Sequence, residues 1–384
     1  MTLDVSPVTD TARSLTGLTI RAIETVPVRV PLERVFRGSY YQMSHRSTIV
    51  TRVHTEEGVV GEAYAGDEDA ALLEIDAIIH HEIEPRLVGE DAMAVERCWS
   101  LARPATFDIL RDRRLGLVAC ACVDAAIWDA VGKALDMPLW RLWGGYRNSI
   151  PMISIGGYYD SPLSIEDEIA VLKERGLAGM KFKVGGLSPA EDAARFIEAR
   201  QAAGDDFILM ADANQGWQVH EAVDFARLVA DHDLFWFEEP CVWSNDRLAM
   251  RDVRLMSGQA VCAGQSEFSA GGCRDLFVAG AVDFCNFDAS WSGGPTEWRR
   301  VAAMAATFGV RMAHHEEAQV SSHLLCSIPH GTFVEIFHEQ RDPIWHHLIA
   351  NRPELRDGSI TLGERPGLGW ELDWDYVERY RVAI

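Results

Sequence analysis

Positive charge is scarce in this sequence. Asp and Glu number 58 against 36 Lys and Arg, which gives a formal net charge of −22, and no block of like charge concentrates the excess. An acidic surface argues against nucleic acid or an anionic membrane as the main partner, because both are negatively charged. A small anionic substrate is still compatible with it, since a pocket can be locally positive or carry a metal.

Cysteine pairs and long apolar runs are also missing. The eight cysteines lack the spacing of a metal finger, and most lie inside apolar runs such as residues 119–123, so buried free thiols in a reducing compartment are expected. Residues 1–17 are polar and carry Asp4 and Asp10, which does not suit a secretory segment, and no other run is long enough to span a bilayer. We expect a soluble, cytoplasmic protein.

Nucleotide-binding loops are absent as well. No Gly-x-Gly-x-x-Gly opens a helix after a predicted strand, and there is no phosphate loop, so a nucleotide-binding fold is disfavoured. Residues 18–65 alternate in the manner of antiparallel strands. Between the first two strands, residues 33–45 predict a long aromatic loop that could serve as a lid. Residues 68–143 have helical periodicity without strand signals.

From about residue 150, strand-like runs alternate with amphipathic helices. Repeated βα units indicate a parallel sheet covered on both faces. Eight such strands favour a closed (β/α) barrel over an open doubly wound sheet. The predicted strands are 151–155, 179–184, 207–211, 234–237, 260–263, 282–287, 310–313 and 332–337.

Polar side chains follow nearly all of these strands, at the ends where barrels carry their sites. One carboxylate there is weak evidence, because Asp also caps helices. Carboxylates on three consecutive strand ends, beside two lysines, predict a functional site. The residues are Lys181, Lys183, Asp212, Asn214, Glu238, Glu239, Gln265, Glu267, Asp288, His314, His315 and Glu335.

The segment Lys181-Phe182-Lys183 is the most informative of these. Alternation along a strand places both lysines on one face and Phe182 on the other. Two neighbouring buried ammonium groups would lower each other's pKa, so that one could take a proton near neutral pH. These residues alone equally suit an edge strand with solvated lysines, and the carboxylates on the other strands argue against that alternative.

The remaining polar residues suggest a metal and a second base. Converging carboxylates repel unless a cation neutralises them, and oxygen ligands favour Mg²⁺. Asp288 would hydrogen-bond one nitrogen of His315 and leave the other as a base, whereas His314 points to the opposite face and is expected to pack. With Glu335 as a nearby acid, this set suits removal of the proton next to a carboxylate.

Motifs along the chain resemble the enolase superfamily, in its mandelate racemase subgroup. They are residues 125–134 and 138–145, then Lys181-x-Lys183, Asp212-x-Asn214, Glu238-Glu239-Pro240, Gly293-Gly294 and His315, in the family's order. The resemblance implies an α+β cap on a (β/α)7β barrel, a modified TIM barrel. The implied divisions are a tail at 1–17, a cap at 18–145 on which 355–384 pack, and a barrel at 146–354.

The resemblance also implies roles for the strand-end residues. Lys183 resembles the base on one face of the substrate, and Lys181 its neighbour that lowers its pKa and contacts the substrate carboxylate. His315, paired with Asp288, resembles the base on the other face. Three further residues have implied roles: Asp212 and Glu238 as ligands of one Mg²⁺ per subunit, and Glu335 as a hydrogen-bonding partner of the substrate carboxylate. An even-numbered homo-oligomer is implied too.

One position departs from the family pattern. Gln265 stands where the family usually has Glu, and strand parity favours Glu267 as third metal ligand, with Gln265 as the alternative. The residues expected to contact substrate are Asn214, Arg37, Tyr41, His45 and Trp291. A polar lid suits dehydration of an aldonate or aldarate to a 2-keto-3-deoxy acid. A racemase or epimerase of a 2-hydroxy acid and a non-catalytic sugar-acid binding protein are the alternatives.

Overall fold

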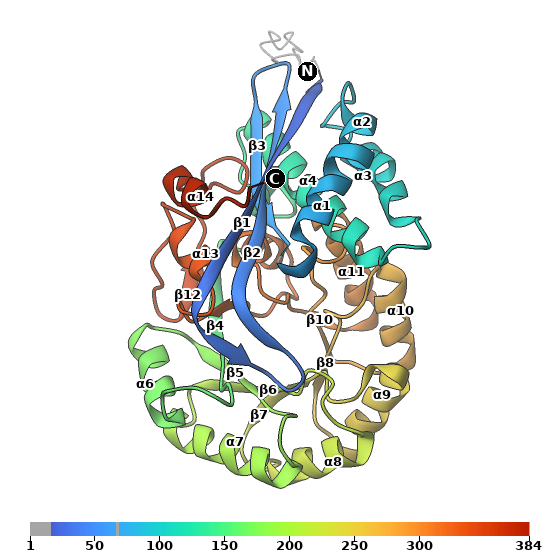
Figure 1. Ribbon diagram of the computed structural model, residues 1–384. Coiled ribbons are helices and arrows are strands. Elements are labelled where there is room, and N and C mark those ends of the chain that lie inside the picture. Colours follow the sequence, from blue (N-terminus) through green and yellow to red (C-terminus); the bar gives the residue numbers. More distant parts are fainter. Residues whose placement is uncertain (1–16, 67–68, 384) are drawn as a thin grey trace, which may run out of the picture.

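The chain forms a parallel barrel with a smaller sheet and a group of helices above its mouth (Figure 1). The structure is a computed structural model that describes residues 17–66 and 69–383. The predicted tail therefore lies outside the described residues, except for Gly17. The predicted fold class, a capped (β/α)7β barrel, is confirmed.

The cap begins with three antiparallel strands, β1 (Ile20–Arg37), β2 (Gln42–Thr55) and β3 (Val60–Ala65). The prediction of a long loop over residues 33–45 is wrong, because pairing continues to the hairpin tip, where Arg37 faces Gln42. The register shifts between Pro31 and Phe36, and this irregularity accommodates the unequal lengths of the two strands. The hairpin is thereby long enough to reach over the barrel (Figure 1).

Helices complete the cap, and α4 (Arg113–Ala134) is its central element. By length and composition α4 could cross a membrane, but 83% of its apolar window is buried inside the protein, as expected for a core helix. Around it lie α1 (Leu72–Ile78), a π-helical turn (Ile79–Ile83), α2 (Glu84–Leu87), α3 (Val95–Ala102) and α5 (Leu139–Leu142).

Eight parallel strands form the barrel in the order β10-β9-β8-β7-β6-β5-β4-β11. It closes where the backbone N–H of Met312 donates to His330 O and that of Thr332 donates to Met312 O. The strands are β4 (Ser149–Gly156), β5 (Gly179–Lys183), β6 (Ile208–Asp212), β7 (Leu234–Glu238), β8 (Val261–Cys262), β9 (Phe284–Cys285), β10 (Arg311–Met312) and β11 (Val334–Phe337).

Seven helices connect these strands and cover the outside of the barrel (Figure 1). Several begin with a side-chain cap, such as the capping box of Ser188 and Glu191 that starts α7, which satisfies otherwise unpaired backbone donors. The helices are α6 (Ile165–Glu174), α7 (Pro189–Ala203), α8 (Val219–Leu228), α9 (Asp246–Ser257), α10 (Ala270–Ala279), α11 (Pro295–Phe308) and α12 (Ala318–Ser327), with α13 (Pro343–His347) after the last strand.

Apolar side chains fill the barrel interior and form a floor below the strand ends. This cluster contains Ile153, Met210, Trp236, Cys262, Phe284, Ala313 and Phe333. Phe182 points the other way and packs edge-on against Phe196 of α7, with ring centroids 6.3 Å apart. Polar side chains near the ends of the strands therefore lie above a packed floor, below the cap.

Two buried carboxylates on α4 tie the cap to the rest of the chain. Asp129 accepts hydrogen bonds from the backbone N–H groups of Glu62 and Leu368. Asp124 accepts from the backbone and hydroxyl of Thr296, at the start of α11. The motif at residues 125–134 thus lies on a structural helix rather than at the strand-end cluster.

The C-terminal segment contacts both layers. Strand β12 (Ser359–Thr361) pairs antiparallel with β4 of the barrel. Helix α14 (Trp374–Tyr380) lies against β1, and the backbone N–H of Val382 donates to Pro27 O.

Candidate active site

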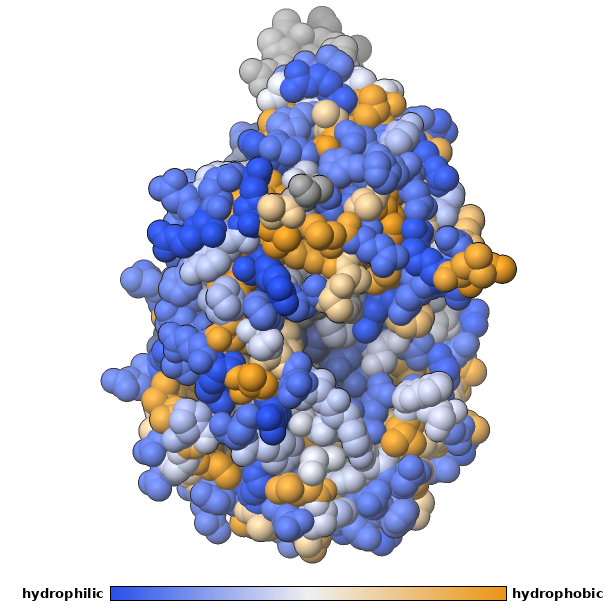
Figure 2. Space-filling model, in the orientation of Figure 1, coloured by the Kyte–Doolittle hydropathy of each residue, from blue (hydrophilic) through white to orange (hydrophobic). Residues whose placement is uncertain are grey.

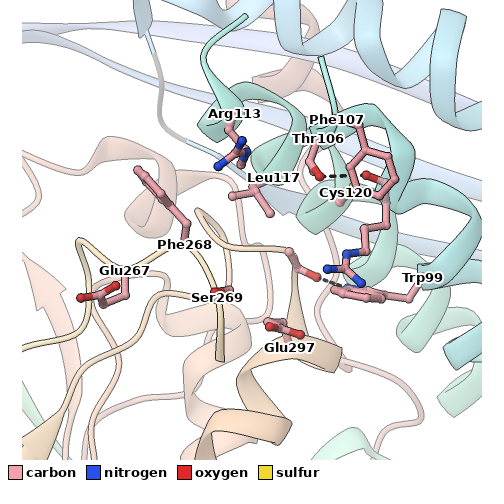
Figure 3. A pocket seen from close by; sticks show the side chains of 12 residues that line it. Trp99, Thr106, Phe107, Arg113, Leu117, Cys120, Glu267, Phe268, Ser269 and Glu297 are labelled. Atoms are coloured by element: carbon pink, nitrogen blue, oxygen red, sulfur yellow. Dashed lines mark hydrogen bonds between the residues drawn. The ribbon is translucent and has the colours of Figure 1, made fainter. Parts of the chain in front are cut away.

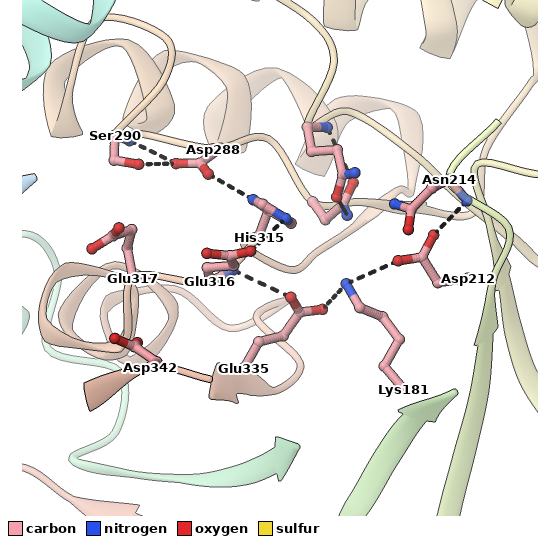
Figure 4. A network of polar contacts seen from close by, with 12 residues as sticks. Lys181, Asp212, Asn214, Asp288, Ser290, His315, Glu316, Glu317, Glu335 and Asp342 are labelled. Carbon is pink, nitrogen blue, oxygen red and sulfur yellow. Dashed lines mark hydrogen bonds and ion pairs between the residues drawn. The ribbon is translucent and has the colours of Figure 1, made fainter. Parts of the chain in front are cut away.

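The two strand-end lysines lie inside the barrel mouth among carboxylates, as Figure 4 shows for Lys181. Lys181 is fully buried, and its Nζ lies 2.7 Å from Glu238 Oε1, 2.8 Å from Glu335 Oε1 and 3.9 Å from Asp212 Oδ2. Its ammonium therefore links strands β5, β7 and β11. The buried ammonium is compensated here by the three carboxyl groups around it.

Lys183 lies beside the same cluster, closer to the cap. Its Nζ is 2.6 Å from Asp212 Oδ2 and 2.8 Å from Asn214 Oδ1, and it lies 5.7 Å from the centre of the Tyr41 ring. The backbone N–H of Asn214 also donates to Asp212 Oδ1. Asn214 thus holds both the carboxylate and the lysine in place.

The charges of this cluster change the expectation for the lysines. Burial lowers the pKa of Lys183, but Asp212, Tyr41 and Tyr158 together outweigh burial, and the net effect is a raised pKa. The pKa of Lys181 is raised too, since Glu238, Glu335 and Asp212 together outweigh the effect of burial. Lys181 does lower the pKa of Lys183, as expected, but in the protein without a bound cation the nearby carboxylates outweigh this contribution.

Amide side chains continue the cluster from Glu238. Burial raises the pKa of Glu238 to about 8, although Lys181 opposes this. Asn286 Nδ2 donates to Glu238 Oε1 at 2.9 Å and to Gln265 Oε1 at 3.2 Å. Asn286 was not predicted as a site residue, although its position directly after β9, two residues before Asp288, could have indicated it.

The structure places Glu267 away from this cluster. Both its carboxylate oxygens accept from Nη2 of Arg247, at 2.8 and 2.9 Å. Glu267 lines a separate cavity of about 600 Å³ beneath the cap helices, beside Phe268 and Ser269 (Figure 3). Strand parity failed because β8 ends at Cys262, so the residues beyond it follow a loop.

Gln265, in contrast, remains with the carboxylates. Its Nε2 donates to Glu239 Oε2 at 3.0 Å, and its oxygen faces Asn286. Among residues 17–66 and 69–383, no three His, Cys, Asp or Glu side chains are grouped as a metal site. Asp212, Glu238 and Gln265 nonetheless follow three adjacent strands and offer only oxygen donors, which suit a hard divalent cation.

A histidine lies across the barrel mouth from the lysines, on the loop after β10. His315 Nδ1 lies 2.8 Å from Asp288 Oδ2, and Asp288 is fixed by the backbone and hydroxyl of Ser290 (Figure 4). His315 Nε2 lies 3.2 Å from Glu316 Oε1. Burial lowers the pKa of His315, but Glu316 and Asp288 outweigh it and raise the pKa well above its usual value.

His314 has the packing role expected for it. Its ring is fully buried; Nε2 accepts from the backbone N–H of Ala289, and Nδ1 contacts the carbonyl of His315.

A buried arginine from the cap holds the segment after His315. Arg46, on β2, contacts Glu316 at 3.1 Å, Glu317 at 3.0 Å and Asp342 at 3.3 Å. Glu316 and Glu317 both have positive φ angles, 51° and 50°, a conformation that costs energy for such residues. Nothing in the local sequence of β2 indicates that Arg46 is buried; only its partners on two distant loops explain it.

Replacing Glu316 should change the titration of His315. In Glu316→Gln we expect the pKa of His315 to fall, because a charge that stabilises the imidazolium is lost. NMR titration of the ring nitrogens measures this. Glu317→Gln is the matched control, since Glu317 also contacts Arg46, whereas Glu316 is the residue that lies 3.2 Å from His315 Nε2; an equal shift in both variants would contradict the assignment.

The predicted substrate contacts divide into two groups. Asn214 contacts Lys183, Tyr41 lies under its ammonium, and the ring of Trp291 lies 4.7 Å from that of His315. Arg37 and His45 are not brought to the cluster. Arg37 is largely exposed and lies 3.7 Å from Asp160, and His45 contacts Ser44 and Arg29 on the outside of the hairpin. Strand alternation turns Arg46 inward instead.

Figure 2 shows that the surface is hollowed between the cap and the barrel.

Two family models together cover most of the chain. The "Mandelate racemase / muconate lactonizing enzyme, N-terminal domain" matches residues 20–144, and the "Enolase C-terminal domain-like" model matches residues 164–376. This chain belongs to the mandelate racemase/muconate lactonizing enzyme family of the enolase superfamily. The resemblance inferred from its motifs is confirmed.

Solved structures of family members superpose closely on the chain. One, described as a mandelate racemase/muconate lactonizing enzyme, is 63% identical with a TM-score of 0.95, and covers 96% of this chain and all of its own. Another, from a marine actinobacterium and in complex with magnesium, is 61% identical with a TM-score of 0.92 and the same coverage.

Relatives of known activity are more distant and catalyse different reactions. The 3,6-anhydro-alpha-L-galactonate cycloisomerase of Streptomyces coelicolor is 29% identical over 95% of this chain and all of its own. The L-talarate/galactarate dehydratase of Salmonella typhimurium is 28% identical over 90% of this chain and 86% of its own. The N-succinyl-L-Arg/Lys racemase of Bacillus cereus is 25% identical over 94% of this chain and 98% of its own. The family therefore includes both lyases and isomerases.

Proposed function

We propose that this enzyme is a Mg²⁺-dependent acid-sugar dehydratase, a lyase that converts an aldonate or aldarate to a 2-keto-3-deoxy acid. The observation that carries the proposal is the placement of two proton-transfer groups across the barrel mouth. Lys183 ends the second barrel strand, whereas the Asp288–His315 pair follows the sixth and seventh. A substrate between them meets a lysine on one face and an imidazole on the other.

Asp212, Glu238 and Gln265 would hold the cation at the ends of β6, β7 and β8. When bound, Mg²⁺ supplies positive charge against the negative charge that develops on the substrate carboxylate. Relatives solved with bound magnesium support Mg²⁺ as the cation. The cation would also offset the carboxylates that raise the pKa of Lys183, and so favour the neutral amine that a base requires.

The remaining residues bind and orient the substrate. Lys181 and Glu335, which lie 2.8 Å apart, would hydrogen-bond the substrate carboxylate from the side of β5 and β11. Lys183 would take the α-proton from one face. His315, kept protonated by Asp288 and Glu316, would donate a proton to the leaving 3-hydroxyl from the other. A histidine held as a cation suits elimination better than racemisation, in which it must also act as a neutral base.

The direct test is an assay of purified protein with Mg²⁺ against a panel of aldonates and aldarates. Formation of a 2-keto acid from at least one member is expected. Failure of every member would refute the dehydratase proposal.

A racemase or epimerase of a 2-hydroxy acid is the second candidate, since bases on opposite faces are also what inversion needs. Reaction in deuterated water separates the two. Deuterium at the α-carbon of recovered substrate, with inversion and without loss of water, would favour the isomerase. Binding without either reaction would favour a non-catalytic sugar-acid binding protein.

The third metal ligand can be tested by calorimetry with Mg²⁺. We expect Gln265→Ala to weaken Mg²⁺ binding about tenfold, because one oxygen donor is lost. Glu267→Gln is the matched control and should leave affinity unchanged, since Glu267 contacts Arg247 instead. A loss of affinity confined to Glu267→Gln would reverse the assignment.

We further propose that the enzyme works in the cytoplasm as a homo-oligomer on a small hydroxy-carboxylate. The eight cysteines are free and buried, which suits a reducing compartment. We also propose that residues 18–145 and 146–354 form its two domains.

A further inference from the structure

Arg341 is a buried arginine without an ionic partner. It is only 2% exposed, and its Nη2 contacts Met43 Sδ on the cap hairpin. Its Nε and Nη1 atoms have no hydrogen-bond partner. Among the described residues, no carboxylate forms an ion pair with it. The guanidinium instead lies 4.2 Å from the centre of the Phe337 ring.

Such an arrangement is costly for a folded protein. A guanidinium carries five donors and cannot be neutralised, and a buried charge without a partner loses its hydration without compensation. The other buried arginines differ. Arg46 contacts three carboxylates, and Arg200 donates to four backbone carbonyls. The free donors of Arg341 therefore point to a ligand that is anionic.

Strand register places Arg341 at the barrel mouth. Phe337, the last residue of β11, pairs with Ile155 of β4, and Arg341 and Tyr158 follow these two strands. The hydroxyl of Tyr158 is also buried without a partner. The guanidinium lies between Met43 of the hairpin and Phe337 at the end of β11. Its charge is within electrostatic range of Glu316, which contacts His315.

We propose that Arg341, assisted by the hydroxyl of Tyr158, binds a second carboxylate at the far end of the substrate. The preferred substrate is then a dicarboxylate, an aldarate, rather than an aldonate. A guanidinium matches a carboxylate with two parallel hydrogen bonds. The inference rests on the proposed function, since Lys181 and Glu335 take the first carboxylate.

The kinetic test compares an aldarate with the aldonate of the same length and configuration. In Arg341→Met, we expect kcat/KM for the aldarate to fall about 100-fold, whereas that for the aldonate changes less than about threefold. Arg341→Lys should recover part of the loss because it keeps the charge but not the bidentate geometry. An equal fall for both substrates, or none for the aldarate, would overturn the inference.

A stability test does not depend on turnover. Arg341→Met should unfold at the same or a higher temperature than the wild type, because it removes an unpaired buried charge. Arg200→Met is the control and should unfold lower, since it leaves buried carbonyls without a donor. Marked destabilisation by Arg341→Met would show a structural role and refute the subsite.

Ligand-induced stabilisation separates the two proposals. With Mg²⁺ present, the aldarate should raise the unfolding temperature of the wild type more than the aldonate does, and Arg341→Met should abolish the difference. If this holds but no 2-keto acid forms, the dehydratase proposal fails and the subsite stands. If both acids stabilise the wild type equally, the subsite is refuted even where dehydration is observed.

Discussion

Lys183→Met should reduce dehydration by about 10²- to 10⁴-fold in kcat, the usual contribution of a positioned general base. Methionine keeps the length of the side chain but cannot take a proton. The assay should use the substrate turned over by the wild type, at saturating Mg²⁺. Asp212 loses its partner at 2.6 Å in this variant, and the bound cation would keep it from remaining an unpaired buried charge.

Two further variants make this result specific. Lys173→Met, on the outer helix α6, is the control and should retain full activity. His315→Asn should also lose turnover, but exchange of the α-proton with deuterated water should continue in it and stop in Lys183→Met. If exchange of the α-proton persists only in Lys183→Met, His315 is the first base and the assigned roles of the two residues are reversed.

Removal of the metal should have an effect of similar size. A chelator should lower activity by about 10³-fold or more, because the charge that develops on the substrate carboxylate loses several kcal/mol of stabilisation. Added Mg²⁺ should restore it. Asp212→Asn should show little recovery at the same Mg²⁺ concentration, since one charged ligand at the end of β6 is lost.

Glu267→Gln provides the comparison for this experiment. The activity of this variant should fall on chelation and return at the Mg²⁺ concentration that restores the wild type. The reason is that the carboxylate of Glu267 contacts Arg247 rather than the cluster. Full activity of the wild type after exhaustive chelation would exclude a role for the cation in the reaction.

Local patterns were sufficient for the barrel and for much of its site. The alternation of strands and helices predicted a closed barrel, and the period of a strand placed Lys181 and Lys183 on one face. Both inferences depend only on near neighbours in the chain. The same reasoning failed where a strand ended or continued unexpectedly. Glu267 left the cluster because β8 stops at Cys262, and the predicted lid loop is strand because its residues pair across the hairpin.

The sequence by itself determined the fold, the family and the chemical types gathered at the strand ends, because hydrophobic period and motif order are properties of the chain. Only the tertiary structure decided which charges meet. It set Lys183 beside Asp212, His315 between Asp288 and Glu316, and Arg341 beneath the hairpin without an anion. The physical reason is that pKa values and unpaired charges depend on distances of a few ångströms between segments far apart in sequence.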